Sequence, residues 1–134
     1  MNDRRMHAAT DDSQRGAAAV EFALVLPILL LLVMGIIEFG LIFNSQISLT
    51  NAAREGARVM AIHNDPAVAK SAAIAAAPSV VNPAISSGNI TVSPSTCAAG
   101  STVTVTIHYN ATLLTGFFGV TLPLTGKGVM LCGG

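Results

Sequence analysis

The sequence predicts an α+β protein in which a long N-terminal helix packs its second half on a small antiparallel sheet. Three observations predict this fold. Residues 22–43 form an almost uninterrupted apolar stretch, long enough for a helix that is apolar on every face. Small and apolar residues then continue at helical spacing as far as Ile62. The last third of the chain changes to the two-residue alternation of β-strands.

The composition indicates a chain that is only partly exposed to water. Hydrophobic residues make up 51% and charged residues 10% of the 134 residues, whereas a soluble domain carries roughly 25% charged residues. The length suits one small domain plus a membrane segment. The formal net charge of zero gives no indication of a nucleic-acid partner. From Met60 onward the only charged residues are Asp65, Lys70 and Lys127, so we expect a surface of Ser, Thr, Asn and backbone, or one covered by a partner.

The apolar stretch Phe22–Phe43, FALVLPILLLLVMGIIEFGLIF, is predicted to cross a membrane as a helix that contains Pro27. Its 22 residues extend about 33 Å, and its only charge is Glu38. The stretch is longer than the roughly 7–15 apolar residues of a cleaved secretory signal, and no small-x-small cleavage site follows it, so we expect it to stay in the mature chain. Three arginines precede it and two follow it nearby, a small bias toward a cytoplasmic N-terminus.

The junction before the apolar stretch has a distinctive pattern. A polar leader ends in Arg15 and Gly16, small residues follow, and Glu21 stands five positions after the glycine, with Phe22 beginning the apolar run. This resembles the processing site of type IV pilin-like precursors, which a membrane-embedded aspartic peptidase cuts on the cytoplasmic side after the glycine. The resemblance implies cleavage between Gly16 and Ala17. Because glycine has no side chain, an extended backbone at Gly16 can enter a narrow protease cleft.

The two acids near the ends of the apolar stretch are candidate assembly residues. A carboxylate at the centre of a membrane-spanning helix costs roughly 2.5–3.5 kcal/mol, and the resemblance implies that the free amine of a neighbouring chain partners Glu21, which with Phe22 would set subunit register. The alternative is an interfacial glutamate that marks where the helix enters the membrane. Glu38 lies about 26 Å further along the helix axis. It predicts either a contact with a partner subunit or an outer boundary marker.

Beyond the apolar stretch we expect the same helix to continue, giving one helix over Ala17–Ile62. Arg54 and Arg58 are four residues apart and share a face, with Glu55 beside it. These arginines are either assembly contacts or part of a solvated helix face. Apolar and small residues recur here at helical spacing: Ile47, Leu49, Ala52, Ala53, Ala57 and Met60.

Three blocks together extend the resemblance: GAAAVEFALVLPILLLL, IIEFG and NAAREGARVMAI. The chain is similar in these blocks to the TadE-like family of the tight-adherence pilus system. The resemblance implies a pilin-like fold and a minor pilin or pseudopilin, matured by a prepilin peptidase, that helps to assemble adhesive pili rather than forming their bulk. It makes Gly16 the cleavage glycine and Glu21 the assembly glutamate. Further family-block positions are Glu38, Asn51, Arg54, Glu55, Gly56 and Arg58.

The remainder is predicted to form a short helix and three or four strands. Asp65 is a suitable N-cap before Pro66, and the alanine-rich segment Ala67–Ala77 is the expected helix. Strands are expected at Asn89–Val92, Ser101–Asn110, Thr112–Leu122 and Gly128–Leu131. In the second of these, the face expected to pack on the helix comprises Val103, Val105, Ile107 and Tyr109.

Two further features concern the C-terminal part. Cys97 and Cys132 can form a disulfide if this part is exported, contributing roughly 3–4 kcal/mol and joining the edges of the sheet. The alternative is two unpaired buried thiols. The run Gly116–Gly119, GFFG, predicts either a tip that contacts a membrane or partner, or two phenylalanines that fold back into a core.

No sequence pattern indicates catalysis. The chain has no phosphate loop, dinucleotide fingerprint, zinc-protease helix or G-x-S-x-G, and its three histidines are far apart. We therefore predict that it is not an enzyme and has no metal, cofactor, nucleic-acid or small-molecule ligand. The expected regions are a cytoplasmic leader at 1–16, a transmembrane helix at 17–43, a projecting helix at 44–62 and an extracytoplasmic α+β domain at 63–134.

The predicted function is that of a single-pass protein of the bacterial inner membrane, with a cytoplasmic N-terminus and a periplasmic or extracellular C-terminal domain. Its expected partners are the membrane, a prepilin peptidase and other pilus-assembly and pilin subunits. Two alternatives stay open. One is an unprocessed single-span scaffold of a secretion complex, and the other is an adhesive ectodomain that uses the helix only as a tether.

Overall fold

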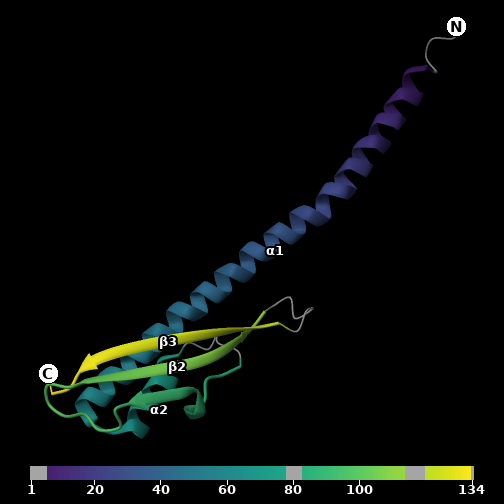
Figure 1. Cartoon of the computed structure of the whole chain (residues 1–134). Coiled ribbons are helices and arrows are strands. Elements are labelled where there is room, and N and C mark those ends of the chain that lie inside the picture. Colours follow the sequence, from purple (N-terminus) through teal and green to yellow (C-terminus); the bar gives the residue numbers. More distant parts are fainter. Residues whose placement is uncertain (1–5, 78–82, 114–119, 134) are drawn as a thin grey trace. The chain divides into compact units, whose positions relative to one another are not determined.

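The computed structural model describes residues 6–77, 83–113 and 120–133, with side chains from residue 15 onward. The chain divides into two compact units, one ending at Ile37 and the other comprising Glu38–Gly134. The fold is α+β and pilin-like, with a long helix and a small three-stranded antiparallel sheet, as the sequence predicts. The elements in Figure 1 are α1 (Met6–His63), α2 (Pro66–Ala76), η1 (Ser87–Asn89), β1 (Ile90–Ser93), β2 (Thr102–Thr112) and β3 (Thr121–Leu131).

Helix α1 begins at Met6, further toward the N-terminus than the predicted start near Ala17. The segment before Ala17 contains alanines and no proline, and Gly16 alone disfavours a helix by only about 1 kcal/mol. At the other end α1 stops at His63, and Asn64 adopts a left-handed conformation with φ of 50°. The backbone N–H of Asn64 donates to the Met60 carbonyl at 2.9 Å, which satisfies one of the last helical acceptors.

Helix α2 begins as the sequence predicts. The Asp65 carboxylate accepts hydrogen bonds from the backbone N–H groups of Ala67 at 2.8 Å and Val68 at 3.4 Å. Pro66 occupies the first turn, where its missing N–H leaves no helical hydrogen bond unmade. Together with the left-handed Asn64, this cap lets the chain reverse between the two helices without a long loop.

The sheet has the order β1-β2-β3, with both strand pairs antiparallel. In its register, Ile107 at the centre of β2 pairs with Ile90 of β1 and Gly126 of β3. The prediction of separate strands at Thr112–Leu122 and Gly128–Leu131 is wrong. Thr112 ends β2, and one strand runs from Thr121 to Leu131.

Two residue types obscured this strand. Pro123 is tolerated within β3 because β3 is an edge strand. On an edge strand, alternate backbone N–H groups point away from the sheet and make no hydrogen bond to a neighbouring strand, so a residue without an N–H can stand there. Gly126 and Gly128 lie within the strand because helix α1 approaches it closely there. A Cβ atom at Gly126 would lie 2.4 Å from the Leu49 carbonyl oxygen, and one at Gly128 would lie 2.4 Å from that of Ala53.

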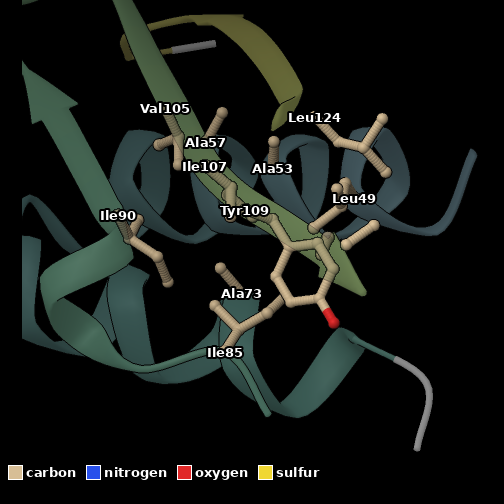
Figure 2. Close-up of a cluster of buried hydrophobic side chains, with 12 residues drawn as sticks. Leu49, Ala53, Ala57, Ala73, Ile85, Ile90, Val105, Ile107, Tyr109 and Leu124 are labelled. Atoms are coloured by element: carbon tan, nitrogen blue, oxygen red, sulfur yellow. The ribbon is translucent and has the colours of Figure 1, made fainter. Parts of the chain in front are cut away.

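The hydrophobic core lies between the inner face of the sheet and the two helices (Figure 2). The predicted alternation of β2 is confirmed: Val103, Val105, Ile107 and Tyr109 are buried, and the residues between them are more exposed. Full burial of each aliphatic side chain stabilises the fold by roughly 1.5–3 kcal/mol. Their partners on the helices are mostly small: Leu49, Ala52, Ala53 and Ala57 of α1, and Ala73 of α2.

Candidate processing and assembly site

The junction residues Arg15–Phe22 lie in α1 and are all exposed. A Cβ atom at Gly16 would meet no atom within 4 Å, so the backbone there is open to an approaching protein. The helical conformation of Gly16 differs from the extended one that a protease cleft binds. Because glycine and its neighbourhood offer no packing to hold that turn, local unwinding at Gly16 costs little.

The apolar stretch of α1 is not the core helix of a soluble protein. Its most apolar 18-residue window has a mean hydropathy of 2.8, and none of that window is buried within the chain. The side chains are large and exposed, for example Leu31 at 76%, Ile28 at 69% and Leu24 at 67%. A surface of this kind is stable in lipid and costly in water. It fits a membrane-anchored protein.

The C-terminal part of α1 has two different faces. The inner face is buried and made mostly of small residues, including Ala52, Ala53, Gly56 and Ala57. A Cβ atom at Gly56 would lie 3.0 Å from the Ala73 Cβ and 3.1 Å from a carbonyl oxygen of α2. The small side chains therefore allow both α2 and β3 to pack against the α1 backbone.

The outer face of the same segment is an exposed strip, which we call the arginine strip. Arg54 and Arg58 are exposed, and Arg58 Nη1 lies 3.5 Å from Glu55 Oε1 in an ion pair three residues apart. Such an exposed pair contributes little to stability. The strip follows one line of the helix surface and comprises Ile47, Asn51, Arg54, Arg58 and Ile62, all exposed. Ile47 and Ile62 give this outer line an exposed apolar residue at each end.

Glu38 is the first residue of the second unit and is partly buried. Exposed aromatic rings follow it on α1: Phe39 is 70% and Phe43 is 59% exposed, and their ring centroids are 6.5 Å apart in a stacked arrangement. Because a phenylalanine ring has no polar group, these two rings extend the exposed apolar surface of α1 as far as Phe43.

Cys97 and Cys132 are joined in a disulfide, with their Cα atoms 5.5 Å apart. Cys97 follows β1 and Cys132 follows β3, so the bridge links the ends of the two edge strands. The Asn64 side chain accepts a hydrogen bond from the Cys97 backbone N–H, which ties the end of α1 to the same place. Cys132 is 1% exposed and packs in a cluster with Met60 and Val103.

Among residues 6–77, 83–113 and 120–133, no group of three or more His, Cys, Asp or Glu side chains is placed to hold a metal ion. Burial raises the pKa of the Tyr109 hydroxyl above its ordinary value, but the ring serves the core. A shallow, open hollow beside α2 is lined by Pro66, Ala67, Lys70, Ser71, Ile74 and Ser87.

Comparison with known proteins gives a family match for the segment that contains the junction and the apolar stretch. Residues 16–58 match the family model of TadE-like proteins. The matched TadE-like segment begins at the junction glycine, Gly16, and ends at Arg58 of the arginine strip. Comparisons with curated proteins and with solved structures gave no match. The family match supports the sequence-based expectation and indicates a pilus-related protein.

The predicted site residues fall into separate groups within the TadE-like segment. Gly16, Ala17, Glu21 and Phe22 lie in the first unit, and Glu38 and the two arginines lie in the second. The phenylalanines of Gly116–Gly119 lie outside the described residues. Sequence reasoning missed the packing role of Gly126 and Gly128. Their spacing of two was a usable signal, because glycines alternating on one face of a strand indicate close backbone approach.

Proposed function

We propose that this chain is a membrane-anchored minor pilin or pseudopilin that takes part in assembling a tight-adherence pilus or a related secretion apparatus, and that its role is not enzymatic. The observation that carries the proposal is the match of residues 16–58 to the TadE-like family. That segment holds the junction, the exposed apolar stretch and all of the arginine strip except Ile62. Each of these features suits a subunit that is anchored in the membrane before it contacts neighbouring subunits.

The proposed orientation has the N-terminus in the cytoplasm and the second unit on the periplasmic or extracellular side of the bacterial inner membrane. The Cys97–Cys132 disulfide supports this orientation. Disulfides persist in oxidising compartments and are rare in the reducing cytoplasm. The second unit is also charge-poor, which suits a surface that other subunits cover.

Processing at the junction is part of the proposal. A prepilin peptidase would cut between Gly16 and Ala17, at a glycine whose surroundings are open. Cleavage gives Ala17 a free amine at the start of the anchored helix. The Glu21 carboxylate of one subunit would then accept a hydrogen bond from the protonated N-terminal amine of its neighbour, because a carboxylate at the membrane boundary is stabilised by an opposite charge. Phe22 would pack beside this contact.

The decisive experiment is intact-mass analysis of the protein purified from membranes and from sheared surface fibres, after alkylation of free thiols. We expect a chain that starts at Ala17 and carries no alkyl group on Cys97 or Cys132. Gly16→Val should keep the leader and reduce piliation. Gly40→Val is the matched control, because it adds the same side chain to a glycine of α1 that also has no atom within 4 Å. Its N-terminus should be that of the unaltered protein.

Two outcomes would contradict the proposal. If the uncleaved chain with Gly16→Val supports full piliation, the chain acts as an unprocessed scaffold. If deleting the gene leaves pili intact and abolishes only attachment, the second unit is an adhesive ectodomain and α1 is its tether. Deletion of the gene separates these two outcomes, because a scaffold is required for fibres to appear and an adhesive ectodomain is not.

A further inference from the structure

The end of the β2–β3 hairpin carries apolar side chains that the fold leaves exposed. Leu122 is 38% and Val120 is 53% exposed. Leu122 lies on the same face of β3 as the buried Leu124, because side chains of a strand alternate between its faces. It pairs with Ala111 of β2, which is only 6% exposed. The apolar face of the sheet therefore continues beyond the point where the hydrophobic core ends.

The contacts between α1 and β3 fix how far this apolar end extends along α1. Gly126 lies against Leu49 and Gly128 against Ala53, so the helix and the strand run in the same direction. Four helix residues advance about 6 Å and two strand residues about 6.6 Å, so the two elements keep nearly the same pace. Extending this register toward the start of β3 places Leu122 at about the level of Leu41.

That level is where α1 leaves the membrane, if the chain is anchored as proposed; the inference rests on that part of the proposed function. The apolar stretch ends at Phe43, and the exposed Phe39 and Phe43 rings lie at the same level. No Asp, Glu, Lys or Arg occurs between Lys70 and Lys127. The hairpin end consequently brings no charge that would have to be removed from water at the lipid surface.

We propose that the end of the β2–β3 hairpin, at Val120 and Leu122, inserts into the outer surface of the lipid bilayer beside α1. The second unit is then held against the membrane at two places, by the helix and by the hairpin. Lipid is the occupant because the exposed side chains are apolar, uncharged and level with the end of the apolar stretch. Insertion driven by apolar contact requires no anionic lipid and is insensitive to salt.

The chain contains no tryptophan, so a single introduced tryptophan reports its own surroundings. The experiment reconstitutes full-length Leu122→Trp in phosphatidylcholine vesicles with and without brominated acyl chains. Val129→Trp is the matched control, since Val129 is 53% exposed near the other end of the same strand. We expect blue-shifted emission and quenching by brominated lipid for Leu122→Trp, and neither for Val129→Trp. Adding phosphatidylglycerol or salt should leave both results unchanged.

Two further variants make the outcome unambiguous. Val120→Trp repeats the measurement just outside the strand, so that a disturbance of pairing by the larger side chain at Leu122 does not decide the result. Leu31→Trp reports on the apolar stretch itself. If Leu31→Trp is quenched while Leu122→Trp and Val120→Trp behave like Val129→Trp, the hairpin contact is wrong and the membrane anchor stands. If Leu31→Trp is also unquenched, the proposed anchoring fails as well.

Discussion

The two halves of helix α1 differ in the size of the apolar side chains that they present to their surroundings. Up to Ile37 the exposed residues are mainly large and aliphatic, and none of the most apolar window is buried. In the second unit most of the buried residues of α1 are small, with Leu49 and Met60 as the large ones: Ser48, Leu49, Ala52, Ala53, Gly56, Ala57 and Met60. The surface of the first half and the buried face of the second half are both mostly apolar, so the size of the side chains is what differs between them.

The difference reflects what covers each half. Lipid chains are fluid and adapt to any side chain, so large aliphatic residues maximise apolar contact without needing a complementary shape. The sheet is rigid, and its strand β3 comes so close that Gly126 and Gly128 meet backbone atoms of Leu49 and Ala53. Small side chains such as Ala52, Ala53 and Ala57 suit such an approach, because protein interiors are close-packed and tolerate little extra volume. The larger Leu49 and Met60 are also fully buried on this face, so the contrast with the lipid-facing half is one of predominant residue size.

The largest expected effect comes from adding volume where the sheet meets the helix. Gly128→Val places a Cβ atom 2.4 Å from the Ala53 carbonyl carbon and oxygen, so β3 and α1 must separate. Overpacking of a core by a side chain usually costs about 1–3 kcal/mol. Here the clash is with backbone atoms, which no side-chain rotation relieves, so we expect a cost above the roughly 2–5 kcal/mol of a large-to-small core change. We expect the second unit to lose most of its cooperative unfolding transition, measured by circular dichroism of the protein in detergent.

The matched change in the other half is Gly35→Val, which meets no atom within 4 Å. It should leave the unfolding transition of the second unit unchanged. Equal loss of stability in Gly128→Val and Gly35→Val would show that the close approach of β3 to α1 is not what holds the unit together.

Local patterns predicted most of this fold. The alternation of β2 identified its buried face, and the pair Asp65 and Pro66 identified the start of α2, because both signals depend on neighbouring residues alone. Strand β3 was divided wrongly because Pro123, Gly126 and Gly128 look like turn residues. Their tolerance depends on an edge position and on the proximity of α1, and both are properties of the tertiary structure.

The candidate site divides in the same way. The spacing of Gly16 and Glu21 is local, so the sequence alone was enough to single out the junction. The level of Leu122 along α1, which is about that of Leu41, does not depend on neighbouring residues in the sequence. It follows from the contacts of Gly126 and Gly128 with α1. No spacing along the chain carries that information.

A smaller effect should follow from removing volume rather than adding it. Met60 is fully buried beside Val103 and Cys132, whereas Met34 is 43% exposed in the apolar stretch. Met60→Ala leaves a cavity among side chains that cannot collapse fully, and we expect a loss of about 2–5 kcal/mol in the free energy of unfolding. Met34→Ala should change that free energy by less than about 0.5 kcal/mol, because surface changes are usually within that range. Chemical denaturation of both variants in one detergent measures the difference, and equal losses would contradict the contrast between the halves.

The smallest effect on stability is expected at the arginine strip, where the comparison becomes one of function. Arg58 pairs with Glu55 at 3.5 Å in an exposed position, so Arg58→Ala should cost only about 0.3–0.5 kcal/mol in the free energy of unfolding. If the strip contacts other pilus subunits, the same change should reduce the number of pili per cell much more than it reduces stability.

Lys127→Ala is the control, since it removes an exposed positive charge from β3 in the same unit. It should leave both the free energy of unfolding and piliation near the values of the unaltered protein. Equal piliation in the two variants would reduce the strip to a solvated helix face. A loss of piliation confined to Arg58→Ala would mean that α1 uses three surfaces. Large side chains of its first half face lipid, mostly small ones of its second half face the sheet, and charged ones of the second half face a neighbouring subunit.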